Sequence, residues 1–162
     1  MDTGCRLPVD LTDSPESCPV ARARNPVLLA SGDKFERVTD FSTVGPFPFE
    51  FTRYFHGGST RQSAFFGIGW RHTFARALVP AGGSWASPSW IDALRPSGQV
   101  VRFTKVGSVY TAPTGIDVAL VASGAEWQFT DIDKAIDRFD GTGGLLWIET
   151  ANGYRQTMTY TS

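Results

Sequence analysis

The stretch Val44–Val79 reads VGPFPFEFTRYFHGGSTRQSAFFGIGWRHTFARALV and carries the clearest periodic pattern in the chain. Every second position of Phe47–Phe55 is aromatic except Arg53, and Trp70–Leu78 in the second arm alternates in the same way, with Arg76 interrupting its apolar face. A side-chain period of two is typical of a β-strand with one buried face. Glycines between Gly57 and Gly69 suit the tight turns that would link the two arms. We therefore expect two antiparallel strands whose aromatic faces start a core. The residues expected in that core are Phe47, Phe49, Phe51, Trp70, His72 and Phe74.

The rest of the chain indicates an all-β domain. Its 162 residues suit one core, and 17 glycines, 10 prolines and 13% aromatic residues favour short strands and turns over helices. No window shows a useful helical period. Turn signals such as Ser97-Gly98 and Asn152-Gly153 separate apolar runs at the spacing of a meander, so we expect a sandwich- or barrel-like module. The expected strands are 35–41, 91–94, 99–105, 109–111, 116–121, 126–130, 135–139, 145–150 and 154–160.

Charge and hydropathy limit the partners. The net charge of −1 and pI near 6.1 give no electrostatic reason to expect nucleic acid, because binding to phosphates needs a basic face. No stretch approaches the roughly 18 apolar residues of a membrane-spanning helix. The start, Met1–Arg6, lacks the features of a secretory signal peptide. We therefore expect no membrane span, and any export would use a route without a classical signal peptide.

Residues 1–24 read as an extended leader, because three prolines and a Thr-Asp-Ser cluster oppose a helix there. The short apolar run Asn25–Ala30 follows, and we expect it to form a hairpin with the strand 35–41. Cys5 and Cys18 are the only cysteines in the chain. They leave three alternatives open: free thiols, one disulfide, or a metal site, of which the last lacks the usual second pair of ligands.

Trp85 and Trp90 stand in the loop Pro80–Trp90 without a clear period. Large aromatic residues more often fold back over a core, which is the first interpretation. If the two rings were exposed instead, they would make a stacking platform for a sugar or an aromatic ligand. These two residues are therefore the candidate binding residues of a stand-alone carbohydrate- or protein-binding module.

Residues that could support catalysis or hold a metal are sparse, and we expect no enzymatic activity and no cofactor. His72 alternates with aromatic residues and is expected to be a buried histidine with a backbone or arginine partner, whereas His56 is expected in a solvated turn. No serine lies in a G-x-S-x-G elbow. The acidic cluster Asp131, Asp133, Asp137 and Asp140 fails the calcium-loop pattern, because Ala135 and Ile136 stand where an acid or amide and a glycine are needed. A solvated charge cluster at a hairpin edge is the expected alternative.

A set of short motifs follows a familiar order. It comprises Asn25-Pro26-Val27, Ser31-Gly32-Asp33-Lys34, Thr39-Asp40-Phe41, Gly45-Pro46, Phe51-Thr52-Arg53, Gly67-Ile68-Gly69-Trp70 and His72. This set resembles the N-terminal domain that precedes the repeats of Rhs/YD-repeat proteins. The tail, from Phe139-Asp140 through Gly144-Leu145-Leu146 and Asn152-Gly153 to Tyr160, looks like one degenerate YD-type repeat, with Leu145 at the place of the usual arginine.

The resemblance implies an organisation and a role. It divides the chain into the leader 1–24, an Rhs N-terminal-like β domain at 25–133 and a degenerate YD-like repeat at 134–162. Proteins of this family look like β-rich shells in which repeated hairpins enclose a C-terminal toxin or effector. The implied role is a non-catalytic structural module that seeds or plugs such a cage in bacterial competition. The rest of the shell, the effector or a secretion apparatus would be its partners, and the cell surface or exterior its destination. The chain holds about one repeat, so we expect a truncated or partial member.

Overall fold

The structure, a computed structural model, describes residues 34–57, 62–63 and 66–161, without the side chains of 62 and 63. The expected leader 1–24, both cysteines and the run Asn25–Ala30 lie outside these ranges. The described chain is all-β, which confirms the expected fold class, and its only helical element is the 3-10 turn η1 (Ala81–Gly83). The strands are β1 (Phe35–Ser42), β2 (Glu50–His56), β3 (Gln62–Ser63), β4 (Gly67–Ile68), β5 (Trp70–His72), β6 (Ala77–Pro80), β7 (Trp90–Leu94), β8 (Val100–Val106), β9 (Val109–Thr111), β10 (Ala119–Ser123), β11 (Glu126–Thr130), β12 (Ile136–Phe139), β13 (Leu145–Glu149) and β14 (Arg155–Thr157).

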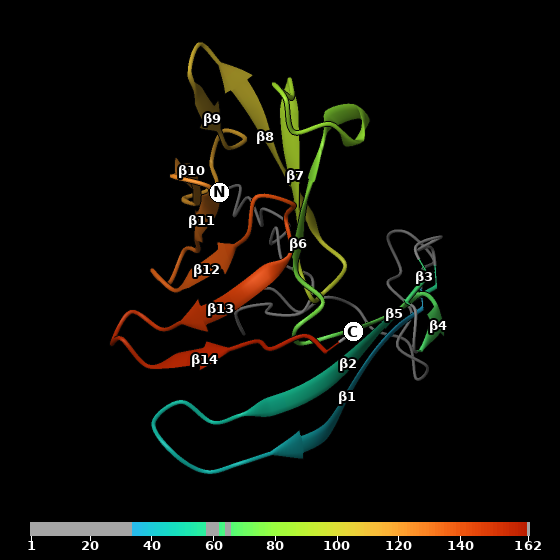
Figure 1. Ribbon diagram of the computed structural model, residues 1–162. Helices are drawn as coiled ribbons and strands as arrows, with labels where there is room; N and C mark the ends of the chain where they lie inside the picture. Colours follow the sequence, from blue (N-terminus) through green and yellow to red (C-terminus); the bar gives the residue numbers. More distant parts are fainter. Residues whose placement is uncertain (1–33, 58–61, 64–65, 162) are drawn as a thin grey trace, which may run out of the picture.

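Nine strands form one antiparallel meander, hereafter the body, in the order β14-β13-β12-β11-β10-β9-β8-β7-β6. The sheet curls strongly into a half-barrel (Figure 1). The curl brings β6 against the turn between β12 and β13, where the amide of Leu78 donates to the carbonyl oxygen of Gly143 at 2.9 Å and Ala77 bridges Gly144. Gly143 adopts φ +84°, and a Cβ there would lie 2.2 Å from the Leu78 carbonyl oxygen. This close approach of two backbones therefore requires glycine.

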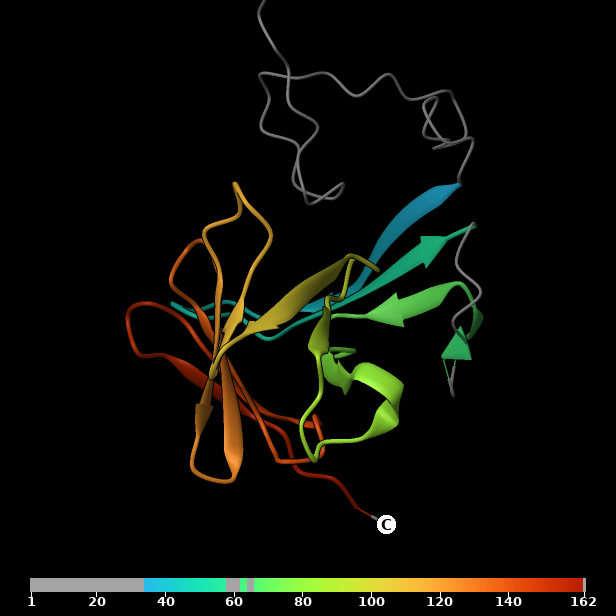
Figure 2. The same ribbon diagram turned by 90° about the horizontal axis from the view of Figure 1, so that it is seen from above.

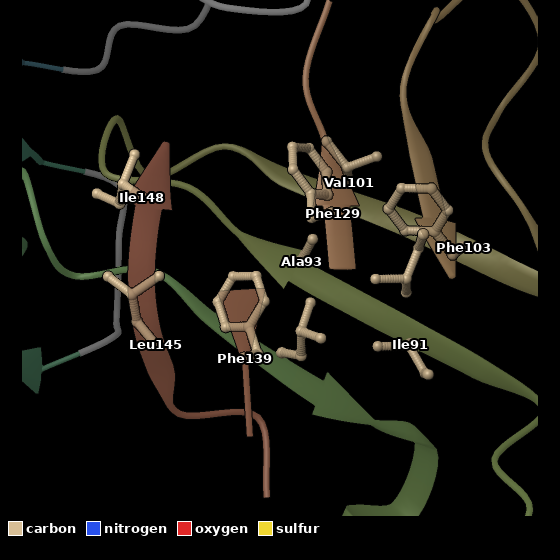
Figure 3. Packing of buried hydrophobic residues seen from close by; sticks show 10 residues of the cluster. Ile91, Ala93, Val101, Phe103, Phe129, Phe139, Leu145 and Ile148 are labelled. Carbon is tan, nitrogen blue, oxygen red and sulfur yellow. The ribbon is translucent and has the colours of Figure 1, made fainter. Parts of the chain in front are cut away.

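The hydrophobic core fills the hollow of the body. Inward-facing residues alternate with exposed ones along β8, where Val101 and Phe103 are buried between exposed neighbours. The rings of Phe103 and Phe129 meet edge to face, with centroids 5.9 Å apart (Figure 3). The buried cluster consists of Leu78, Ile91, Ala93, Val101, Phe103, Leu120, Phe129, Phe139, Leu145 and Ile148.

A smaller three-stranded sheet, hereafter the arm, has the order β1-β2-β5 and projects to one side of the body (Figure 2). The two halves of the Val44–Val79 stretch do pair antiparallel, as predicted, from Phe55↔Trp70 to Arg53↔His72. The second half is not one continuous strand, however. The chain turns after β5, where the Ala75 amide donates to the His72 carbonyl oxygen, and it resumes as β6 in the other sheet.

The buried core therefore lies on other residues than the six that the alternation of Val44–Val79 pointed to. Phe49 is 43% exposed, and Phe47, Phe51, Trp70, His72 and Phe74 are half-buried. Of these six, only Phe47 and Phe74 pack against the buried cluster of the body. The fully buried residue of β2 is Thr52, at 0% exposure, on the opposite, polar face. That face can be buried because its hydroxyl and backbone groups are hydrogen-bonded, to Thr39, Glu50 and Thr73.

The meander matches the expected strands closely over 91–149, except that β10 starts at Ala119 and β14 spans only three residues. The expected hairpin of 25–30 with 35–41 lies partly outside the described residues; within them, one side of β1 pairs with β2. The boundary expected at residue 133 falls in the tight turn between β11 and β12, and the sheet runs through it without a break. Buried core residues lie on both sides of that turn, Phe129 before it and Phe139 after it.

Candidate functional site

β14 is the open edge of the body. It pairs with β13 through Trp147↔Thr157, Ile148↔Gln156 and Glu149↔Arg155, and within the described ranges no strand pairs with its other side. The Met158 amide extends the pairing by donating to the Leu146 carbonyl oxygen at 2.8 Å. An edge of this kind presents unpaired backbone donors and acceptors to a further strand.

A cross-strand row fixes which β14 residue faces inward. Phe129 on β11 stands opposite Asp137 on β12, Asp137 opposite Ile148 on β13, and Ile148 opposite Gln156 on β14. The first three are buried and Gln156 is half-buried, because its side-chain amide donates to the Pro48 carbonyl oxygen at 3.1 Å. The tip of the β1–β2 hairpin therefore lies beside the open edge, as Figure 1 shows.

A buried ion network ties together segments that are distant in the sequence. Asp137, only 1% exposed, accepts two hydrogen bonds from Arg76 Nη1, at 2.6 and 2.9 Å, and one from Arg95 Nη1 at 2.5 Å. Arg95 also pairs with Asp131 through its second amino group and stacks over the Phe129 ring, 4.3 Å from the centroid. The network joins the chain before β6, the β7–β8 turn and strand β12.

The acidic cluster is therefore not the solvated edge that the sequence suggested. Asp137 is a core-facing residue with two arginine partners, and Asp131 is half-buried in the same network. Asp133 is exposed, as expected. Asp140 organises the β12–β13 turn by accepting from the Thr142 hydroxyl and from the amides of Thr142 and Gly144. These bonds, the hydroxyl first, hold the pKa of the Asp140 carboxyl below its usual value despite partial burial.

The two histidines also differ from expectation. His56 is half-buried rather than solvated, with its ring 5.0 Å from that of Phe35 and against Gly98 of the β7–β8 turn. For His72, the described residues supply neither the backbone nor the arginine partner that was expected at Nδ1. Its Nδ1 is buried, and the described residues offer that atom no hydrogen-bond partner. Burial first, and the positive charge of Arg71 second, lower the pKa of His72.

A second arginine of the alternating stretch, Arg53, is paired on the arm. Arg53 donates two bonds to Asp40, at 2.6 and 2.8 Å, and lies over the Trp70 ring at 5.2 Å. Asp40 is therefore the carboxylate that binds Arg53. The hydrogen bond from Arg53 lowers the pKa of the Asp40 carboxyl.

Trp85 and Trp90 do not lie side by side as a platform. Trp85 is half-buried, packs against the core cluster, and its ring lies 5.6 Å from that of Trp127. Trp90 opens β7, and the guanidinium of Arg102 covers its ring at 3.8 Å while donating two hydrogen bonds to Asp92. Each ring thus has a partner within the protein.

The described ranges contain neither a candidate metal site nor a candidate membrane-spanning helix. Within them, no group of three or more histidine, cysteine, aspartate or glutamate side chains is placed to hold a metal ion. The same part of the chain contains no helix long and apolar enough to cross a membrane.

Comparison with known proteins gives one match. The family described as Domain of unknown function (DUF6531) matches residues 24–103, just under half of the 162-residue chain. The matched span covers the arm and the body as far as β8. No curated protein matches the chain. The family description attributes no activity.

Proposed function

We propose that this chain is a non-catalytic structural module that seeds or plugs a β-cage of the Rhs/YD-repeat kind. In this proposal further β-hairpins add at β14 and continue the meander into the wall of a shell around a C-terminal toxin or effector. The remaining shell, the effector or a secretion component would be the partners. Export by a route without a classical signal peptide belongs to the same proposal.

One observation carries the proposal: β14 is an open edge, and its residue Gln156 stands in the same cross-strand row as the buried residues Phe129, Asp137 and Ile148. Hairpin repeats cannot bury their apolar faces alone and need neighbours. The row from Phe129 to Gln156 already aligns four strands, so the next strand would place its inward residue beside Gln156. Backbone hydrogen bonds along the edge would supply affinity, and the inward side chains would supply register.

The test extends the full chain at its C-terminus by one designed β-hairpin with alternating apolar residues. Amide hydrogen exchange at Arg155 and Thr157 is the measurement, with the unextended chain as reference, because these two amides alternate with the positions of β14 that bond to β13. We expect exchange at these amides to slow at least tenfold, because pairing removes them from water. The matched control carries two prolines in the first added strand, which cannot donate to the ladder and should restore fast exchange.

Unchanged exchange in the extended chain would overturn strand addition at β14. The same result would leave the second class of function, a stand-alone carbohydrate- or protein-binding module, as the better explanation. That alternative predicts quenching of tryptophan fluorescence by glycans, abolished by Trp85→Ala or Trp90→Ala. The ring partners of both tryptophans favour the structural module.

A further inference from the structure

His72 sits within a cluster of aromatic rings on the arm. The Phe51 ring stacks on it, with centroids 5.4 Å apart and planes inclined by 21°. Phe66 meets it edge to face at 5.8 Å, and Phe74 lies 6.5 Å away. The histidine therefore joins three separate segments: β2, the turn before β4, and the chain that leads from β5 to β6.

The cluster suits a neutral imidazole. A neutral ring carries one N–H donor and one acceptor nitrogen, whereas the protonated ring carries two donors. His72 Nδ1 is buried and has no hydrogen-bond partner among the described residues. Protonation at this atom would bury a charged donor without an acceptor, which is much costlier than leaving an acceptor unused.

The charges around His72 add to this preference. Arg53 stands directly opposite it in the β2–β5 register, and Arg71 precedes it in the chain. The carboxylates on β1 and β2 are already bound: Asp40 by Arg53, Glu36 by Lys34, and Glu50 by Arg37 and the Thr52 hydroxyl. Arg76, beyond the turn, is bound to Asp137. The surroundings therefore hold positive charge near the ring and no unengaged carboxylate on these elements.

We propose that His72 makes the arm an acid-sensitive element, whose β2–β5 pairing and aromatic cluster loosen on protonation while the body stays closed. The inference goes beyond the proposed cage role and does not depend on it. The lowered native pKa sets the direction. An unfolded histidine titrates near 6.5, so the neutral form supports the arm fully above that pH, and the support is lost as the pH falls below it. The stability of the body should not change over this pH range through histidine protonation, because its buried cluster contains no histidine.

The test uses the full chain between pH 7.5 and 5.0. His56 and His72 are its only histidines, and the carboxyls of Asp40 and Asp140 titrate below this window. Hydrogen exchange of β2 and β5 amides is measured relative to that of β11–β13 amides, which corrects for the intrinsic pH dependence of exchange. The relative opening of the arm should rise about tenfold for each unit by which the native pKa lies below the unfolded one.

Two variants assign the effect. His72→Phe keeps an aromatic ring in the cluster and should abolish the pH dependence, whereas His56→Asn, the matched control, should retain it. Loss of the effect in His56→Asn with retention in His72→Phe would overturn the proposal. If His72→Phe does not fold, NMR titration of the His72 ring in the wild-type chain decides instead. A native pKa below 6.5 supports the switch, and a value at or above 6.5 refutes it.

Discussion

Asp137→Asn should be the most damaging conservative change in the body. The carboxylate is 1% exposed and binds two guanidinium groups whose side chains are only 16% and 11% exposed. Asparagine has the same shape but is neutral and offers a donor where an acceptor is needed, so two buried cations lose their counter-charge. Breaking a buried ion pair from one side costs about 3–5 kcal/mol, a large part of the 5–15 kcal/mol that stabilises an ordinary domain.

The assay is urea denaturation followed by tryptophan fluorescence, with stability taken from the linear extrapolation. The matched control is Asp117→Asn, which removes an exposed pair with Lys134 whose side chains are 79% and 61% exposed. It should cost less than about 1 kcal/mol, since exposed pairs contribute little. Arg76→Met should then cost less in the Asp137→Asn background than in wild type, with a coupling of about 0.5–3 kcal/mol. A loss below about 1 kcal/mol for Asp137→Asn would refute the role assigned to the network.

Three further predictions concern closure, acid sensitivity and the arm. Gly143→Ala should destabilise the chain by about 2–4 kcal/mol in the same assay, because it adds a positive-φ penalty to a backbone clash, whereas Gly107→Ala, in open space, should cost about 1–2 kcal/mol. The lowered pKa of Asp140 means that its contribution is complete above the unfolded pKa near 3.9 and is lost as the pH falls through the lower native value. Thermal melts between pH 5 and pH 2 should therefore fall less steeply for Asp140→Asn, and an unchanged slope contradicts the turn's role. Trp70→Ala should cost no more than about half of the roughly 3–5 kcal/mol of Phe103→Ala, since its ring is half-buried; equal losses would count against that placement.

Sequence reasoning located most strands of the body, because period-two alternation and glycine turns are local signals. In the run Val100–Val106, Val101 and Phe103 alternate with polar residues, and Ser97-Gly98 before it and Gly107 after it mark both ends. The tight turn around Asn152-Gly153 was found in the same way. The pairing of the two halves of Val44–Val79 followed from the same pattern, since alternation and a glycine-rich connection are typical of antiparallel neighbours.

The more buried face of β2 could not be predicted in this way. Alternation separates the two faces of β2, and hydrophobicity predicts that the aromatic face is the buried one. The residue of β2 that is fully buried is instead Thr52, on the polar face, where hydrogen bonds satisfy its polar groups. The Arg76–Asp137 pair joins positions 61 residues apart, so no local sequence pattern predicts it. The unpartnered Nδ1 of His72 depends on the positions of neighbouring backbone and side chains, which the sequence does not contain.

The contact between Leu78 and Gly143 has a consequence for the order in which the body is completed. During synthesis the β6–β8 segment emerges first and carries Ile91, Val101 and Phe103, whose fully buried positions all face the hollow of the sheet. Their covering residues, such as Phe139, and the glycine that docks β6 arrive about 40 residues later, at the cost of closing a long loop. The nascent chain therefore exposes an apolar surface and an open strand edge to solvent for several seconds, at translation rates of about 5–20 residues per second. During that interval this half of the sheet is the part of the body most exposed to aggregation.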